Sequence, residues 1–238
     1  MKNVISYIKN LDKNKFFDLD FLEKEFILKL GLNDEVLDEQ PDELKDFFGK
    51  GLGLKIWQYP NQFAKYIKFL AENAKFISSY LEIGARHGGT FIVTSEVLKK
   101  FNINFNKSIA IDLIEPRNNI EQYLKERDFA LYKSVNSISE EFTVFINENY
   151  FDLVLIDGDH RYDFVKSDGD LTRDKSKIQV YHDIVNNNPG CIGVGVYWNE
   201  IKNKYKDLYK FYEFTDQYES VLKRKHTTYL GIGVAFKL

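Results

Sequence analysis

The sequence predicts an α/β fold, in which a doubly wound, mostly parallel sheet ends in an antiparallel strand and follows an N-terminal helical appendage. Two observations carry this prediction. Short apolar stretches alternate with amphipathic ones from Pro60 to Phe236, and such alternation is typical of a sheet covered by helices on both faces. The chain has 238 residues, 44% of them hydrophobic, which is enough to bury one sizeable core.

The N-terminal quarter differs from the rest of the chain. Apolar residues recur at near-helical spacing from Leu11 to Leu32, and the acidic stretch from Asp34 to Gly53 is broken by one proline and three glycines. We therefore expect short helices and loops here. Residues 1–56 are interpreted as an appendage that acts as a lid or a dimer arm, or that only covers core, and residues 57–238 as the main domain.

The main domain is expected to begin with a helix at Pro60, because proline suits the first turn of a helix. The aromatic and amide cluster that starts at Trp57 either lines a pocket or packs against this helix. Further helices are expected at Thr90–Phe101, Asn119–Arg127, Glu140–Asn147, Tyr162–Leu171 and Ile192–Tyr205. Strands are expected between them, at Tyr80–Ile83, Ser108–Leu113, Ala130–Val135, Phe151–Ile156 and Ile178–Tyr181.

Two strands are expected at the C-terminal end, Phe211–Phe214 and Leu230–Phe236. The residues between them show no clear helical pattern, so we expect the two strands to pair antiparallel. Phe151–Ile156 is apolar on both faces, and this composition indicates a central strand.

Composition excludes several classes of protein. The formal net charge is −3, which is unusual for a general nucleic-acid binder. Cys191 is the only cysteine, so an internal disulfide and a cysteine-based zinc site are impossible, and we interpret Cys191 as structural. No apolar run approaches the length of a membrane span. The first residues lack the apolar core of a secretory signal, so a cytoplasmic location is expected.

The first strand-to-helix turn carries a glycine motif. It reads Glu82-Ile83-Gly84-Ala85-Arg86-His87-Gly88-Gly89-Thr90. Arg86 stands where the dinucleotide fingerprint has its middle glycine, the residue that lets backbone approach a pyrophosphate. This disfavours NAD and FAD and favours a ligand that offers an amine, a ribose and an adenine.

Polar residues also end the next two strands. Asp112 ends the second, where a carboxylate can accept both hydroxyls of a ribose. Asn136 and Ser137 follow the third, in a short turn suited to hydrogen-bonding an adenine edge.

An acidic block follows the central strand, and a His-Asp pair follows the next one. Asp157, Asp159 and His160 form the block, and His182 and Asp183 the pair, with Asp183 lying 26 residues after Asp157. Neighbouring parallel strands would bring both to one edge of the sheet. Three readings stay open: Asp157 and Asp183 bind a metal such as Mg²⁺, His160 or His182 acts as general base, or the residues only cap helices.

Taken together, these residues resemble the class I S-adenosylmethionine-dependent methyltransferases. The block Ile156-Asp157-Gly158-Asp159-His160 is similar to that of a bacterial subgroup of small-molecule and sugar O-methyltransferases. The resemblance covers Trp57 to Leu238 and implies a Rossmann-like sheet. It also implies that S-adenosylmethionine is bound through Glu82, Gly84, Gly88, Asp112, Asn136, Ser137 and Asp157.

The function that we expect is transfer of a methyl group from S-adenosylmethionine to a small polar metabolite. The accepting atom would be the oxygen of a hydroxyl, or of a phosphate or phosphoramidate group. The resemblance suggests that the metabolite belongs to bacterial surface-glycan or capsule biosynthesis. Asp157, His160 and His182 would be the catalytic residues. The local basic residues suggest a phosphorylated or nucleotide-linked acceptor, with no nucleic acid as partner, and a homodimer is compatible with the appendage. Candidate acceptor contacts are Arg86, His87, Tyr162 and Arg224. The alternatives are an iron-dependent hydroxylase with a similar core and a non-catalytic cofactor-binding subunit.

Overall fold

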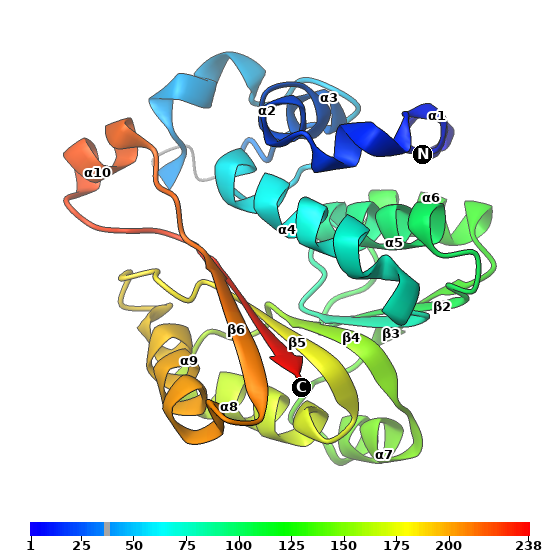
Figure 1. The fold of residues 1–238 in the computed structure, drawn as a ribbon, viewed down its shortest axis with the longest axis vertical. Helices are drawn as coiled ribbons and strands as arrows, with labels where there is room; N and C mark the ends of the chain where they lie inside the picture. The colour runs from blue at the N-terminus through cyan, green and yellow to red at the C-terminus, as the bar shows by residue number, and fades with distance from the viewer. Residues whose placement is uncertain (36–38) are drawn as a thin grey trace.

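The computed structural model describes residues 1–35 and 39–238, and Figure 1 shows their layered arrangement around one sheet. The sheet has seven strands in the order β3-β2-β1-β4-β5-β7-β6. The strands are β1 (Ser79–Ile83), β2 (Lys107–Asp112), β3 (Ala130–Ser134), β4 (Phe151–Ile156), β5 (Ser176–His182), β6 (Tyr209–Phe214) and β7 (Ile232–Lys237). Strands β1 to β5 pair in parallel, and β7 pairs antiparallel with both β5 and β6. The predicted α/β class, Rossmann-like and mostly parallel with an antiparallel C-terminal strand, is confirmed.

Helices cover both faces of the sheet (Figure 1). One face carries α4 (Pro60–Asn73), α5 (Gly89–Phe101) and α6 (Asn118–Glu126), and the other carries α7 (Glu140–Glu148), α8 (Tyr162–Arg173) and α9 (Ile192–Tyr205). Pro60 occupies the first turn of α4, as its missing N–H favours. The hydroxyl of Ser139 caps α7 by accepting the N–H of Phe142 at 3.2 Å. Because both faces are covered, the interior strands are buried along most of their length, whereas the edge strands β3 and β6 are partly exposed.

The N-terminal residues pack on the outside of α4 and α5 instead of forming a core of their own. Their elements are α1 (Lys2–Asn10), η1 (Lys13–Phe17), α2 (Leu19–Phe21), η2 (Leu22–Phe26), α3 (Ile27–Leu30) and η4 (Asp42–Phe47), and η5 (Ala74–Phe76) follows α4. Phe16 and Phe26 are fully buried in the same hydrophobic cluster as Phe63 of α4. Short helices and loops are therefore found as predicted, and residues 36–38 of the predicted stretch lie outside the described residues.

The connection between β6 and β7 corrects one expectation, because it contains the helix α10 (Glu219–Lys225). The helix carries Glu219 in its first turn and three basic residues in its last, an arrangement that the helix dipole favours. Val221 is buried beside Tyr59 and Leu230. A single apolar anchor in seven residues gives no periodicity to read, which is why the sequence pattern did not indicate a helix.

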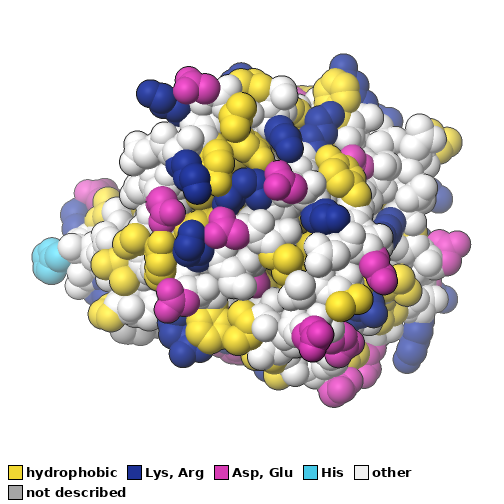
Figure 2. Space-filling model, turned by 90° about the horizontal axis from the view of Figure 1, so that it is seen from below, with side chains coloured by type: hydrophobic (Ala, Val, Ile, Leu, Met, Phe, Trp, Pro, Cys, Tyr) yellow, Lys and Arg dark blue, Asp and Glu magenta, His cyan; other side chains and the backbone are white. Residues whose placement is uncertain are grey.

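Charge is mixed on the surface. On the face shown in Figure 2, Lys and Arg side chains are interspersed with Asp and Glu, in keeping with the net charge of −3. Among the described residues, no helix is both long and apolar enough to cross a membrane.

Candidate active site

A cavity of about 720 Å³ opens at the carboxyl ends of β1, β2, β4 and β5. This is the edge at which open α/β sheets bind ligands. Twelve of the residues singled out in the sequence line it: Glu82, Gly84, Arg86, His87, Asp112, Asn136, Ser137, Asp157, Asp159, His160, His182 and Asp183. Residues as far apart in the sequence as Glu82 and Asp183 are thus brought to one site by the order of the strands.

The first turn is built on a close backbone approach. Gly84 has φ of 89°, and a Cβ on it would lie 2.1 Å from the carbonyl oxygen of Asp157. Only glycine allows the loops after β1 and β4 to meet this closely. Gly88, which was expected to contact the cofactor, has φ of 81° and packs toward Ile120 outside the residues that line the cavity. The role that the structure gives Gly88 is therefore to start α5.

Two acids stand at the ends of β1 and β2. Glu82 is 1% exposed and accepts the hydroxyl of Tyr80. Burial, with the nearby charges of Asp157 and Asp112, raises the pKa of Glu82 well above its ordinary value. Asp112 accepts the backbone N–H of Arg86 at 2.7 Å and that of Leu113 at 2.7 Å. These bonds fix the Asp112 carboxylate at the cavity wall while its oxygens keep further lone pairs for a ligand.

The turn after β3 forms the opposite end of the cavity. Asn136 and Ser137 line it, and the side chain of Asn136 accepts the N–H of Ile138 at 3.2 Å. Val135, on the same loop, is buried. This end offers polar groups beside apolar surface, which suits a flat heterocycle with polar edges.

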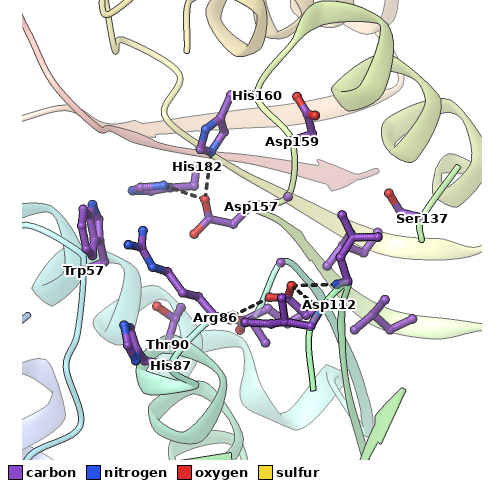
Figure 3. Close-up of a pocket in the computed structure, with 18 of the residues that line it drawn as sticks. Trp57, Arg86, His87, Thr90, Asp112, Ser137, Asp157, Asp159, His160 and His182 are labelled. Atoms are coloured by element: carbon purple, nitrogen blue, oxygen red, sulfur yellow. Dashed lines mark hydrogen bonds and ion pairs between the residues drawn. The ribbon is translucent and has the colours of Figure 1, made fainter. Parts of the chain in front are cut away.

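A charged group from the N-terminal residues meets the first turn. The guanidinium carbon of Arg86 lies 4.0 Å from the ring centre of Trp57, and its Nη2 donates to Glu35 at 3.0 Å. His87 Nε2 lies 2.9 Å from Glu35 as an ion-pair contact, without the alignment of a hydrogen bond. Burial lowers the pKa of His87 although Glu35 opposes this shift. Figure 3 shows Arg86 extending from the turn toward Trp57.

The carboxyl ends of β4 and β5 bring together Asp157, His160, His182 and Asp183, hereafter the His–Asp cluster. Asp157 Oδ1 lies 2.9 Å from His182 Nδ1 and 3.3 Å from His160 Nε2. Asp183 Oδ2 lies 3.1 Å from His160 Nε2 and 3.3 Å from His182 Nδ1. Figure 3 shows the two imidazoles turned toward Asp157. The predicted juxtaposition of the acidic block and the His-Asp pair is thus present.

The cluster pairs two acids with two bases. Burial opposes charge on Asp157, but His182 and His160 hold its pKa well below the usual range. Burial likewise opposes charge on the imidazoles, but the neighbouring carboxylates raise the pKa of His160 to about 11 and that of His182 to about 10. The neighbouring carboxylates therefore favour the protonated form of both imidazoles when no other ligand is bound.

Surrounding groups hold the cluster in place. Asn186 Nδ2 donates to Asp183 Oδ1 at 2.6 Å, and Asp183 itself has φ of 65°. Cys191 Sγ lies 3.6 Å from His160 Nδ1. The interpretation of Cys191 as structural thus becomes more specific, because its thiol contacts a residue of the cluster.

Two candidate acceptor contacts lie elsewhere. Tyr162 donates its hydroxyl to Glu200 at 2.6 Å, and Arg224 donates to Asp42 at 2.7 Å and to the carbonyl of Gln40 at 2.6 Å. Neither lines the cavity. The cavity is also lined by residues that were not chosen as site residues from the sequence: Lys55, Trp57, Thr90, Arg117, Arg161 and Phe164. Of these, only Trp57 was noted in the sequence as a possible pocket residue.

The chain was compared with known proteins. Residues 81–183 match the family model of a methyltransferase domain, and no curated protein sequence matches the chain. One similar solved structure is TomG, an O-methyltransferase from Streptomyces achromogenes that is involved in tomaymycin synthesis and was solved with S-adenosylmethionine. Its sequence is 15% identical, and its TM-score is 0.54. The alignment covers 95% of this chain and 99% of TomG. A candidate RNA methyltransferase from Pyrococcus horikoshii is 12% identical, with a TM-score of 0.55 and coverage of 92% and 98%.

A third solved structure is MycE, a methyltransferase of the mycinamycin pathway, solved with Mg and S-adenosylhomocysteine. It is 12% identical with a TM-score of 0.50, and the alignment covers 76% of this chain but only 48% of MycE. At such identities the likeness shows the fold. The matched segment begins within β1 and ends at Asp183, so it contains the first turn and the whole His–Asp cluster. The match to the methyltransferase domain model therefore spans both groups of site residues, and the chain shares a Rossmann-like fold with these solved methyltransferases.

Proposed function

We propose that the protein transfers the methyl group of S-adenosylmethionine to a hydroxyl of a small, polar, negatively charged metabolite. The observation that carries the proposal is the order of groups along the cavity. Glu82 and the glycine turn at Gly84 line one end of the cavity, and Asp112 lies in its middle. Asn136 and Ser137 line the other end. This order suits the methionine, ribose and adenine parts of one extended cofactor.

The size of the cavity leaves room for both reactants. Ligand pockets hold roughly 300–1,000 Å³, and this one holds about 720 Å³. With the adenosyl part at Asp112 and Asn136, the sulfonium would lie toward Asp157, at the end of the central strand. The acceptor hydroxyl would then enter beside the His–Asp cluster.

Methyl transfer is an in-line displacement. The acceptor oxygen forms a bond to the methyl carbon while the carbon–sulfur bond breaks, and its electron pair stays on sulfur. The protein aligns these atoms at roughly 3–3.5 Å, and the hydroxyl must lose one proton. We assign the removal of this proton to the His–Asp cluster, whose imidazoles and carboxylates line the cavity at the end of the central strand.

The charge of the acceptor is inferred from the cations on the cavity wall. Lys55, Arg86 and Arg117 line it, and the Trp57 ring and the Glu35 carboxylate hold the Arg86 guanidinium at the cavity wall. Arginine is suited to bidentate recognition of phosphate or carboxylate. We therefore assign Arg86 and His87 to a phosphorylated or nucleotide-linked acceptor, whereas the contacts of Tyr162 and Arg224 give them no such role.

The metabolic setting is part of the same proposal. TomG and MycE are described as enzymes of tomaymycin and mycinamycin synthesis, whereas the Pyrococcus horikoshii protein is described as a candidate RNA methyltransferase. The proposal of a small acceptor therefore rests on the enclosed cavity and its lining residues. Surface-glycan or capsule biosynthesis rests on the resemblance of the Ile156–His160 block. Lys55 and Trp57 line the cavity and Glu35 pairs with Arg86, which favours a lid over a dimer arm for residues 1–56. A homodimer and a cytoplasmic location stay predictions.

An iron-dependent hydroxylase is the second candidate, favoured by one observation, the two imidazoles and two carboxylates in the cluster. Such donor sets also hold non-haem iron. Calorimetric titration with S-adenosylmethionine and with 2-oxoglutarate separates the two. We expect one site for the first ligand and no heat with the second. A binding site for 2-oxoglutarate alone would favour the hydroxylase, and cofactor binding without transfer to any acceptor would indicate a non-catalytic subunit.

A matched pair of variants tests the placement of the cofactor. Asp112→Ala should weaken S-adenosylmethionine binding at least tenfold, because it removes the acceptor for the ribose hydroxyls. Asp174→Ala is the control, since that side chain is 93% exposed and lies far from the cavity. Equal affinity of both variants would contradict the proposed placement.

A further inference from the structure

The sequence suggested Mg²⁺ at Asp157 and Asp183, and MycE was solved with Mg. The residues present do not fit that ion well. Mg²⁺ takes oxygen ligands in octahedral geometry and usually keeps several waters. Half of the donors in the His–Asp cluster are imidazole nitrogens, and imidazole suits iron, zinc, nickel and copper better than magnesium.

We propose that the His–Asp cluster binds one divalent transition-metal ion, of the Mn²⁺, Fe²⁺ or Zn²⁺ class, in preference to Mg²⁺. The proposal concerns the same cavity as the proposed function but does not depend on which cofactor that cavity takes. Its basis is the arrangement of the four donor atoms and of the groups around them.

The donor atoms form a closed ring in which nitrogen and oxygen alternate. The four edges of the ring measure 2.9, 3.3, 3.1 and 3.3 Å. Ligand atoms bound at roughly 2.0–2.2 Å to one metal ion stand about 3 Å apart, so the ring already has the size that a metal requires. All four donors lie within 4.8 Å of one another.

Hydrogen bonds alone do not account for the ring. Each of the two ring nitrogens can carry one proton, yet each lies within 3.3 Å of an oxygen from both aspartates. One proton aligns well with only one of two such acceptors. Asp183 Oδ2 meets both imidazoles as ion-pair contacts only, whereas a single cation at the ring would satisfy all four donors.

Residues around the ring hold in place the side chains that would coordinate the metal ion. Asn186 donates to the Asp183 oxygen outside the ring at 2.6 Å, which leaves the other oxygen for the ring. Metal-binding carboxylates are usually held by such partners. His182 is 3% exposed, and its Nε2 has no hydrogen-bond partner among the residues that the structure describes. A buried unpartnered nitrogen at the cavity marks a place where a ligand or a bound water belongs.

Burial distinguishes the ring from a surface cluster of acids. The side chains of His182 and Asp183 are 3% and 4% exposed, and those of Asp157 and His160 are 18% and 27% exposed. The first two residues form the closed side of the ring, and the other two face the cavity. An ion held here would keep open positions toward the acceptor, as catalytic metal sites do.

Binding is tested on the full chain after dialysis against a chelator. MnCl₂, ZnCl₂ and MgCl₂ are titrated in separate calorimetric runs, and the loss of the free Mn²⁺ signal is followed by electron paramagnetic resonance. We expect one site for Mn²⁺ and for Zn²⁺, and at least tenfold weaker binding of Mg²⁺. Equal or tighter binding of Mg²⁺, or no Mn²⁺ or Zn²⁺ binding at millimolar concentration, would overturn the proposal.

Variants identify the ligands. Asp183→Asn and His182→Gln should each weaken Mn²⁺ binding at least tenfold, with the fold checked by circular dichroism. Asp159→Asn is the matched control, because Asp159 lines the same cavity but pairs with Arg161 at 2.6 Å outside the ring. Equal losses in the control and in the ring variants would refute the assignment. Titration of the same samples with S-adenosylmethionine shows separately whether the proposed function fails.

Discussion

Asp168 offers a test of how the chain tolerates a buried charge beside the cavity. The residue lies on α8 and is fully buried. Neither of its carboxyl oxygens has a well-aligned hydrogen-bond partner among the described residues, although Ser137 is close enough to stabilise the charge in part. Burial raises the pKa of Asp168 from its ordinary value of 3.8 to about 7, because an ionised carboxylate is costly in an apolar surrounding.

The sign of the effect follows from the two states. In the unfolded chain Asp168 loses its proton near its ordinary pKa of 3.8, whereas the folded chain keeps the proton to about pH 7. The free energy of unfolding is therefore highest below pH 3.8, falls as the pH rises to about 7, and is level above that. The full shift of about three pKa units corresponds to about 4 kcal/mol, of which about 3 kcal/mol falls between pH 5 and pH 8.

Asp168→Asn removes the titrating group and keeps its shape. Urea unfolding of both proteins at pH 5, 6, 7 and 8 measures the difference. The wild-type protein should lose about 3 kcal/mol more than the variant over this range. Asp174→Asn, at a side chain that is 93% exposed, should follow the wild-type curve. Parallel curves for wild type and Asp168→Asn would refute the reasoning.

Three further predictions concern the first turn and the core. Gly84→Ala should lower the free energy of unfolding by about 1–3 kcal/mol and abolish S-adenosylmethionine binding. The reason is that the added Cβ would lie 2.1 Å from the Asp157 carbonyl oxygen. Denaturant titration measures the change in stability, and calorimetry measures the loss of binding. Arg86→Gln should leave the dissociation constant of S-adenosylmethionine within about threefold but raise the KM of an anionic acceptor. Arg127→Met should destabilise the fold by about 3–5 kcal/mol in urea, because it strips Glu96, 4% exposed, of donors at 2.7 and 2.8 Å.

Two of these variants, Gly84→Ala and Arg127→Met, have a matched control. Gly190→Ala should be nearly neutral, since the nearest atom to its added Cβ is 3.7 Å away. Lys2→Met should change stability by less than about 1 kcal/mol, because Lys2 is 82% exposed and 3.8 Å from Glu126. A tenfold loss of cofactor affinity in Arg86→Gln would instead assign Arg86 to the carboxylate of the cofactor.

The strands were predictable from the sequence because their burial leaves a plain signal. Phe151–Ile156 is apolar on both faces in the sequence and lies as β4 in the interior of the sheet. The carboxyl ends of parallel strands meet at one edge by topology, which is why Asp157 and Asp183 could be expected together. The antiparallel pairing of β6 and β7 was predicted from the absence of a clear helical pattern between them, and the pairing holds although residues 215–231 contain α10.

Other features depend on contacts that no local pattern encodes. Apolar residues recur at near-helical spacing from Leu11 to Leu32, but this spacing does not show where tertiary packing divides the segment into 3-10, α and π helices. Arg224 is in a basic run that suggested an acceptor site, yet it pairs with Asp42 across 182 residues. Glu35 reaches Arg86 in the same way. Partners so distant in sequence are set by the fold as a whole.

The most direct test of the central claim is a crystal structure of the protein with S-adenosylhomocysteine. The proposed function predicts the ribose hydroxyls on the Asp112 carboxylate, the adenine beside Asn136 and Ser137, and the sulfur toward Asp157. A ligand bound outside this cavity, or one whose ribose lies away from Asp112, would contradict it.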